Sequence, residues 1–215
     1  PLTLILTPLF TLIKEDKDAH RQGIYDMMRK NSERILHLIN QMMDLRKIDK
    51  GQMVMHMSET DIVTFIGDEY KLFCQQAIAK SIQFTFEHED EALPVWIDRD
   101  NFDKVLMNVL SNAFKFTPAG GRIRITLSHS QHHVRIAIKD SGKGIQEDKL
   151  ETIFQRFYQS TTSSNDRNVG TGIGLDLTRS LVELHYGTIT AANNNTLDEA
   201  DWKEGSQFLI TLHLG

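Results

Sequence analysis

Residues 101–118 read Asn101-Phe-Asp-Lys-Val-Leu-Met-Asn-Val-Leu-Ser-Asn-Ala-Phe-Lys-Phe-Thr-Pro118. We predict a helix over 99–116 that is apolar almost all round, apart from one stripe formed by Asn108, Asn112 and Lys115 at i, i+4 and i+7. Burying an amide without a partner costs about 1–3 kcal/mol, so this stripe must face something polar. Two interpretations are open: an oxygen-ligated magnesium ion with phosphates, or a buried amide network that bridges to a neighbouring loop.

A second informative segment is 136–145, Ile136-Ala-Ile-Lys-Asp-Ser-Gly-Lys-Gly-Ile145. A predicted strand runs into Asp140, and Gly142 and Gly144 then allow the backbone to turn tightly and a ring to approach closely. A buried carboxylate at a strand end can accept a hydrogen bond from an exocyclic amine such as that of adenine. Taken alone, Asp-Ser-Gly is also an ordinary turn sequence.

The third segment, Val169-Gly-Thr-Gly-Ile-Gly-Leu-Asp-Leu177, places alternate glycines at the start of a helix predicted near 172–186. Backbone N–H groups beside a helix N-terminus form an anion site. The spacing fits neither the dinucleotide fingerprint nor the P-loop. An aromatic segment at 153–158 and a polar stretch up to 168 precede it, which suggests a lid over that site.

The hydrophobic pattern of the remaining chain predicts an α+β fold, a two-layer α/β sandwich with an antiparallel or mixed sheet covered on one face. A further helix is expected over 60–80. The expected strands are 53–57, 82–86, 93–97, 123–127, 134–138, 187–192 and 206–213.

Residues 1–51 form a separate predicted domain, an antiparallel helical hairpin, and 52–215 form the second domain. Apolar residues recur at helical spacing from Ile24 to Ile48, and Lys50-Gly51 ends the helix. So broad an apolar face needs a partner surface. Self-association into a dimeric four-helix bundle would bury it, and packing on the following domain is the alternative.

The composition is that of a soluble globular chain, with 40% apolar and 25% charged residues. A net charge of −5 argues against a nucleic-acid surface built on bulk positive charge. The single cysteine, Cys74, excludes an internal disulfide and a thiolate cluster. The apolar stretch 2–13 is too short for a membrane span, which needs about 20 residues.

Together these segments resemble the ATP-binding domain of sensor histidine kinases, which has a Bergerat-type fold, over 53–215. Residues 108–118 match its asparagine box, 140–145 its first glycine box and 154–158 its phenylalanine box. Residues 170–177 match its second glycine box, and Gly205-Ser-Gln-Phe208 its closing motif. The opening Pro1-Leu-Thr-Leu-Ile-Leu is similar to the end of the phospho-acceptor box, in a wording typical of hybrid sensor kinases of Bacteroidetes.

The resemblance implies ATP and magnesium as ligands. The implied magnesium ligands are Asn112 and Asn108, while Lys115 and Arg156 would approach the phosphates and Asp140 would bind the adenine amine. The remaining implied nucleotide contacts are Gly142, Gly144, Ile145, Gly170, Thr171, Gly172, Ile173, Gly174, Leu175 and Ser206. Asp176 departs from the family, which usually has a small residue there, and we expect its carboxylate to point away from a triphosphate.

The resemblance also implies that the γ-phosphoryl group of ATP goes to a histidine. That histidine is expected five residues before Pro1, so no catalytic residue is assigned within the chain. The implied partners are a second copy of the chain and a response-regulator receiver domain. We expect no nucleic-acid partner, and we expect the chain to be the cytoplasmic portion of a membrane-bound sensor that contacts the membrane only through segments outside it.

Two alternatives remain. A Bergerat-fold ATP hydrolase or serine kinase is one, but such hydrolases carry a glutamate one turn before the magnesium asparagine. That position is Asn108 here, and an amide cannot take a proton from water at neutral pH. A degenerate nucleotide-binding module used for dimerisation is the other.

Overall fold

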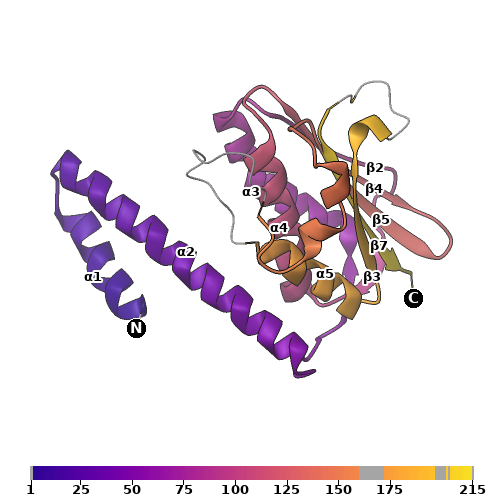
Figure 1. Ribbon diagram of the computed structural model, residues 1–215, viewed down its shortest axis with the longest axis horizontal. Coiled ribbons are helices and arrows are strands. Elements are labelled where there is room, and N and C mark those ends of the chain that lie inside the picture. The colour runs from indigo at the N-terminus through magenta and orange to yellow at the C-terminus, as the bar shows by residue number, and fades with distance from the viewer. Residues whose placement is uncertain (1, 160–171, 197–201, 203, 215) are drawn as a thin grey trace. The chain divides into compact units, whose positions relative to one another are not determined.

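The computed structural model of the chain describes residues 2–159, 172–196, 202 and 204–214, in two compact units. The first unit is Pro1–Met53 and the second is Val54–Gly215. Figure 1 shows a helical hairpin in the first unit and a twisted sheet with helices in the second. No helix in the described ranges has the length and apolar character that crossing a membrane requires.

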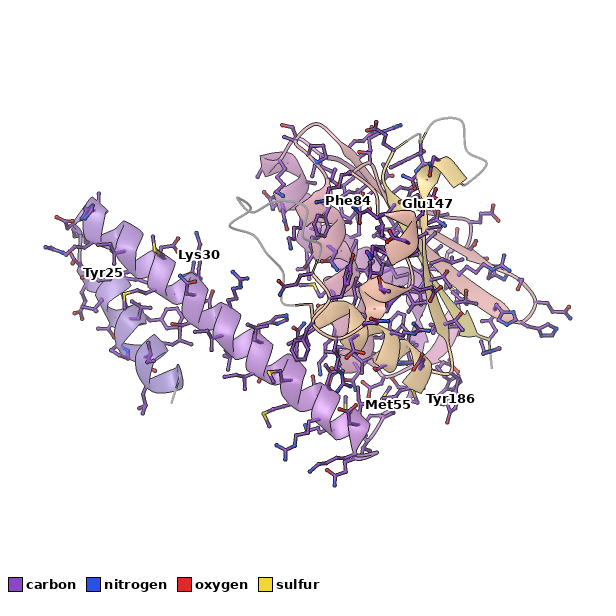
Figure 2. All side chains as sticks on the ribbon, viewed as in Figure 1. Tyr25, Lys30, Met55, Phe84, Glu147 and Tyr186 are labelled. Atoms are coloured by element: carbon purple, nitrogen blue, oxygen red, sulfur yellow. The ribbon has the colours of Figure 1, made fainter. Side chains whose placement is uncertain are left out.

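The first unit consists of two helices that pack on each other, α1 (Leu2–Glu15) and α2 (Ala19–Asp49). Asp18 caps α2 by accepting a hydrogen bond from the Arg21 N–H at 2.9 Å. Asp16 accepts from the Arg21 guanidinium at 2.6 Å and from the Tyr25 hydroxyl at 3.0 Å, which fixes the turn. Figure 2 labels Tyr25 at this end of the hairpin.

The end of α2 and its surface both follow the sequence pattern. The helix ends before Lys50-Gly51, and Gly51 has the positive φ of +63° that the predicted stop requires. Among the hairpin side chains that the structure describes, twelve large apolar ones are at least 40% exposed within the chain. They are Leu4, Ile5, Phe10, Leu12, Ile24, Met27, Met28, Ile35, Leu36, Ile39, Met42 and Met43.

The second unit contains a five-stranded mixed sheet in the order β2-β4-β5-β7-β6. Its strands are β2 (Gln83–His88), β4 (Arg122–His129), β5 (His133–Asp140), β6 (Thr188–Asn193) and β7 (Ser206–His213). Only β2 and β4 run parallel; the other neighbours are antiparallel. A separate antiparallel pair joins β1 (Ser58–Asp61) to β3 (Pro94–Ile97).

Helices α3 (Ile62–Ala79), α4 (Arg99–Phe116) and α5 (Gly174–Leu184) cover one face of this sheet, as Figure 1 shows. The strands alternate as a half-buried sheet should, with Ile123 and Ile125 buried and Arg122 and Arg124 on the opposite face. Phe84 lies in the core, with its ring centroid 5.1 Å from that of Phe114 on α4 (Figure 2). The hydrophobic layer therefore lies between sheet and helices, and the predicted two-layer α/β architecture is confirmed.

The side chain of Trp202 is buried on the outer face of the sheet. Its ring centroid lies 4.6 Å from the Arg122 guanidinium carbon, 5.5 Å from that of Arg124 and 5.2 Å from the Lys139 ammonium. Cations over an indole face attract its π electrons. Trp202 thus covers the polar face of β4 and β5, a role that its polar sequence surroundings did not indicate.

One predicted strand is wrong. Residues 53–57 form no strand, and β1 begins only at Ser58. The three methionines do alternate with their neighbours, since Met53, Met55 and Met57 are half-buried and Val54 and His56 are exposed. The segment is therefore extended with one inward face, but it lacks a partner strand for ladder hydrogen bonds. A period-two pattern reports burial and not pairing.

Candidate functional site

Helix α4, which carries the polar stripe, has a capped N-terminus and a side-chain contact with α5. Asp98 caps the helix by accepting the Asn101 N–H at 3.1 Å. Asn108 is half-buried, and its side-chain amide donates to the Gly174 carbonyl and to the Thr178 hydroxyl, both at 3.3 Å. This contact joins the middle of α4 to the first turn of α5.

The next residue of the stripe behaves differently. Asn112 is half-buried, and in the described part of the chain no hydrogen bond involves its side chain. One turn further, the Lys115 ammonium lies 4.8 Å from the centroid of the Phe116 ring. The Asn108 contacts fit the interpretation of the stripe as a buried amide network. The side-chain amide of Asn112 has no such contact among the described residues, which fits the interpretation that the stripe faces a magnesium ion and phosphates.

Asp140 ends β5 in a buried position with 3% of its surface exposed. Its Oδ1 accepts the Gly142 N–H at 2.7 Å and its Oδ2 accepts the Ser206 hydroxyl at 2.6 Å. Burial away from water raises the pKa of this carboxyl, and the hydrogen bonds from Ser206 and Gly142 oppose the rise. Ser206 reaches Asp140 because β7 starts beside the end of its antiparallel neighbour β5.

The turn after Asp140 packs closely against the end of α4 and requires a glycine there. A Cβ added to Gly142 would lie 2.6 Å from the Phe116 carbonyl oxygen, so only glycine permits this approach of the turn to the end of α4. Beyond it, Asn193 exchanges two hydrogen bonds with the Ile145 backbone, accepting at 2.8 Å and donating at 2.6 Å. Gly144, between these fixed points, has a φ of +70°.

Sequence reasoning missed two asparagines that support this turn. Besides Asn193, the buried Asn194 donates to the Asp140 carbonyl at 2.8 Å and to the Glu204 carbonyl at 2.7 Å. A side chain at Gly205 would overlap the Asp140 backbone, so the closing motif packs directly on the strand end. The available signal was the asparagine run at 193–195, which follows the strand expected over 187–192.

The second glycine run leads into α5. Gly170 and Thr171, and most of the expected lid, lie outside the described residues. Gly172 has a φ of +70°, and a Cβ there would lie 2.6 Å from the Tyr158 carbonyl oxygen. Its carbonyl accepts the Phe157 N–H at 2.9 Å. Ile173 is buried, and Gly174 and Leu175 begin the helix half-buried.

Arg156 and Asp176 form an ion pair, with Nε and Oδ2 2.6 Å apart. The family resemblance implies that Arg156 approaches phosphate, and we expect Asp176 to point away from it. Neither expectation indicates that the two residues meet. The three motifs are otherwise brought together by α4, since Asn108 contacts the start of α5 and Phe116 contacts the glycine turn after Asp140. An amide-lined helix face, a buried carboxylate and a helix N-terminus suit a nucleotide with a cation.

Known proteins are similar to this chain in sequence and fold. The family model described as "Histidine kinase-, DNA gyrase B-, and HSP90-like ATPase" matches residues 97–215. The isolated catalytic domain of histidine kinase ThkA is 30% identical, with a TM-score of 0.63 over 74% of this chain and 98% of that domain. The chain belongs to the histidine kinases. Its second unit contains their ATP-binding catalytic domain, as the motifs had indicated.

Longer relatives match both units of this histidine kinase chain. "Histidine kinase P4" of Formosa agariphila is 33% identical over 100% of the chain, and "Sensor histidine kinase TmoS" of Ectopseudomonas mendocina is 35% identical over 90% of it. The chain spans only 16% and 20% of these two proteins. The solved structure of full-length ShkA in complex with AMPPNP shares the fold, with a TM-score of 0.80 over 99% of the chain at 21% identity.

Proposed function

We propose that this chain binds magnesium-ATP between α4, the turn after β5 and the start of α5. In this proposal the chain presents the γ-phosphoryl group to a histidine upstream of Pro1, for later relay to a response-regulator aspartate. One observation carries the proposal: α4 contacts both of the other motif segments. Asn108 on α4 donates to the Gly174 carbonyl at the start of α5, and the end of α4 packs on the turn whose Gly142 N–H donates to Asp140. The AMPPNP complex of ShkA supports a nucleotide at a site of this fold.

Asp140 is assigned to the adenine amine. The Asp140 carboxylate already accepts hydrogen bonds from the Gly142 N–H and from Ser206. These two donors fix the orientation of the carboxylate before a ligand arrives. Because the site is buried, a hydrogen bond from an exocyclic amine to this anion is stronger than in water. Ser206, Gly144 and Ile145 complete the base-binding wall.

Asn112 and Asn108 are assigned to magnesium. A carbonyl such as that of Gly174 only accepts hydrogen bonds, so the Asn108 group facing it is the NH₂. We assign the side-chain carbonyl oxygen of Asn108 to the ion, together with that of Asn112, which stands one helical turn later. Amide oxygens are hard ligands of the kind that magnesium accepts together with phosphate oxygens.

The phosphates are assigned to the N-terminus of α5 and to nearby cations. Gly172 and Ile173 directly precede this helix, and Gly174 and Leu175 begin it. The helix dipole favours an anion beside these backbone groups. Lys115, Arg156, Gly170 and Thr171 are the further phosphate contacts that we propose. Since phosphoryl transfer is catalysed mainly by positioning and charge neutralisation, these residues need no general base of their own.

The hydrolase alternative lacks its proton acceptor. Asn108, which stands one turn before Asn112, donates its NH₂ to Gly174 and Thr178 and cannot deprotonate water. Its contacts therefore favour transfer to a protein side chain over hydrolysis. The degenerate-module alternative is disfavoured because the glycine turns, the buried Asp140 and the α4 stripe all keep the geometry that a nucleotide requires.

We propose that the first unit dimerises. Its twelve exposed apolar side chains form a broad surface on two helices, which a second hairpin would cover in a four-helix bundle. A receiver domain is the second proposed partner, in line with the structure of ThkA in complex with the response regulator protein TrrA. We further propose that the parent protein is a membrane-bound sensor with this chain in its cytoplasmic portion. Its narrower assignment to Bacteroidetes hybrid kinases also stays a prediction.

Radiolabelled ATP tests the transfer step. A chain extended upstream to include the expected histidine should acquire label that is lost in acid and retained in base, as a phosphohistidine is. The same extended chain with that histidine changed to alanine, and the present chain, should stay unlabelled. Label of equal amount in all three would contradict the proposed acceptor.

A further inference from the structure

We propose that Asp176 determines how strongly this site binds ATP relative to ADP. In this inference Asp176 lowers ATP affinity in two ways, by holding the Arg156 guanidinium and by placing a negative charge in the first turn of α5. The inference rests on the proposed function, because it concerns the site assigned above to the phosphates. Neither effect follows from the family pattern, in which this position usually has a small residue.

The ion pair is part of the folded framework. Its partners are 20 residues apart in sequence, and their side chains are 43% and 18% exposed for Arg156 and Asp176. The segment of Arg156 is fixed on the next residue, where the Phe157 N–H donates to the Gly172 carbonyl at 2.9 Å. An N–O distance of 2.6 Å is that of a strong charge-assisted hydrogen bond. Arg156 is therefore directed toward α5 before any nucleotide arrives.

The carboxylate also belongs to the helix turn that we assign to the triphosphate. Asp176 belongs to the first turn of α5, the turn in which the Gly174 carbonyl accepts the Asn108 amide. A helix N-terminus stabilises negative charge, and the Asp176 carboxylate already places one negative charge there. Each added phosphate brings more negative charge close to this carboxylate, so the repulsion grows from adenosine to ADP to ATP. Arg156 compensates part of it.

Replacing Asp176 by asparagine keeps the size of the side chain and removes its charge. We expect the dissociation constant for magnesium-ATP to fall roughly three- to tenfold, that for ADP to fall less, and that for adenosine to stay the same. The gain should shrink in roughly 0.5 M salt, where charges interact over only a few ångströms. Asp176→Glu keeps the charge and should keep the wild-type ratio of ATP to ADP affinity.

Isothermal titration of the whole chain with each nucleotide measures these constants. Glu183→Gln is the matched control, because Glu183 lies on the same helix, pairs with Arg179 at 3.2 Å and is two turns away from the glycine run. This control should bind all three nucleotides as the wild type does. Arg156→Gln should weaken ATP binding, and the double variant should show that the two substitutions are not additive.

The possible results separate the two proposals. A wild-type chain that binds no nucleotide overturns the proposed function and this inference with it. A wild type that binds ATP while Asp176→Asn has unchanged affinities for ATP and ADP overturns this inference alone. Equal gains for ATP and adenosine, or the same gain in Glu183→Gln, also overturn it. Should Asp176→Asn fail to fold, Asp176→Ala gives the same comparison.

Discussion

Asp140→Asn is the substitution that best separates the binding role of the buried carboxylate from its structural role. Asparagine has the same shape, so its Oδ1 can still accept the Gly142 N–H, now at 2.7 Å, and its NH₂ can donate to the Ser206 hydroxyl, now 2.6 Å from Oδ2. What the variant loses is an anionic acceptor. Burial raises the pKa of Asp140, so the fold itself gains nothing from this charge.

The magnitudes follow from those contacts. A hydrogen bond to a charged acceptor contributes about 1.5–3 kcal/mol, so the variant should bind ATP roughly 10- to 100-fold more weakly than the wild type. Its free energy of unfolding should stay within about 1 kcal/mol, because the hydrogen bonds to the Gly142 N–H and to the Ser206 hydroxyl have replacements. Guanine carries an acceptor oxygen in place of the amine, so the preference for ATP over GTP should also shrink.

Calorimetric titration with ATP and GTP, beside urea unfolding of the same samples, measures these effects. In the wild type, ATP affinity should fall as the pH is lowered through the raised pKa of Asp140, because protonation removes the acceptor; in Asp140→Asn it should not vary with that titration. Wild-type affinity for ATP in the variant would refute the assignment of Asp140 to the adenine amine. So would a loss of ATP binding explained fully by unfolding.

Three further predictions concern α3, the glycine turn after Asp140 and the helical hairpin. The pKa of Glu69 is raised from 4.5 to about 7, mainly by burial and also by the neighbouring Asp103. As the pH rises, Glu69 therefore ionises at a lower pH in the unfolded chain than in the folded chain. The free energy of unfolding should therefore fall by about 1–3 kcal/mol between pH 4.5 and about 7. A wild-type free energy of unfolding that does not change over this pH range would contradict the prediction, and so would an equal fall in Glu69→Gln. Gly142→Ala should lower stability by about 1–3 kcal/mol in urea unfolding, because its methyl group would meet the Phe116 carbonyl at 2.6 Å; an unchanged midpoint would count against this close packing. Ile35 is 48% exposed on the hairpin, and Ile35→Lys should shift the chain toward monomers in sedimentation experiments, whereas an unchanged mass would exclude this face from the dimer.

Much of the fold could be predicted because burial leaves a periodic trace. The helix predicted over 99–116 is α4 with the same bounds, and the alternation at 134–138 marks the inward side chains of β5. The segment 53–57 shows the limit of this reasoning. Met55 alternates in burial as a strand residue would, but pairing depends on a partner backbone that no local pattern encodes.

The site residues also fall into those that the sequence pattern could predict and those that it could not. Asn108, Asn112 and Asp140 could be found because polar residues at regular positions of an apolar helix or at a strand end need an explanation. Contacts between distant segments could not be found, such as Asn194 on the Asp140 carbonyl or Arg156 on Asp176, because each depends on how the two elements meet in space.

The central claim is that the stripe on α4 faces a magnesium-nucleotide complex. Calorimetric titration with AMPPNP, with and without magnesium, tests it in the wild type and in Asn112→Ala. We predict clear binding by the wild type that strengthens with magnesium, and weaker binding by the variant with most of the magnesium dependence lost. Asn31→Ala, on α2, is the matched asparagine control and should behave as the wild type. Equal affinity and equal magnesium dependence in the wild type and Asn112→Ala would contradict the account.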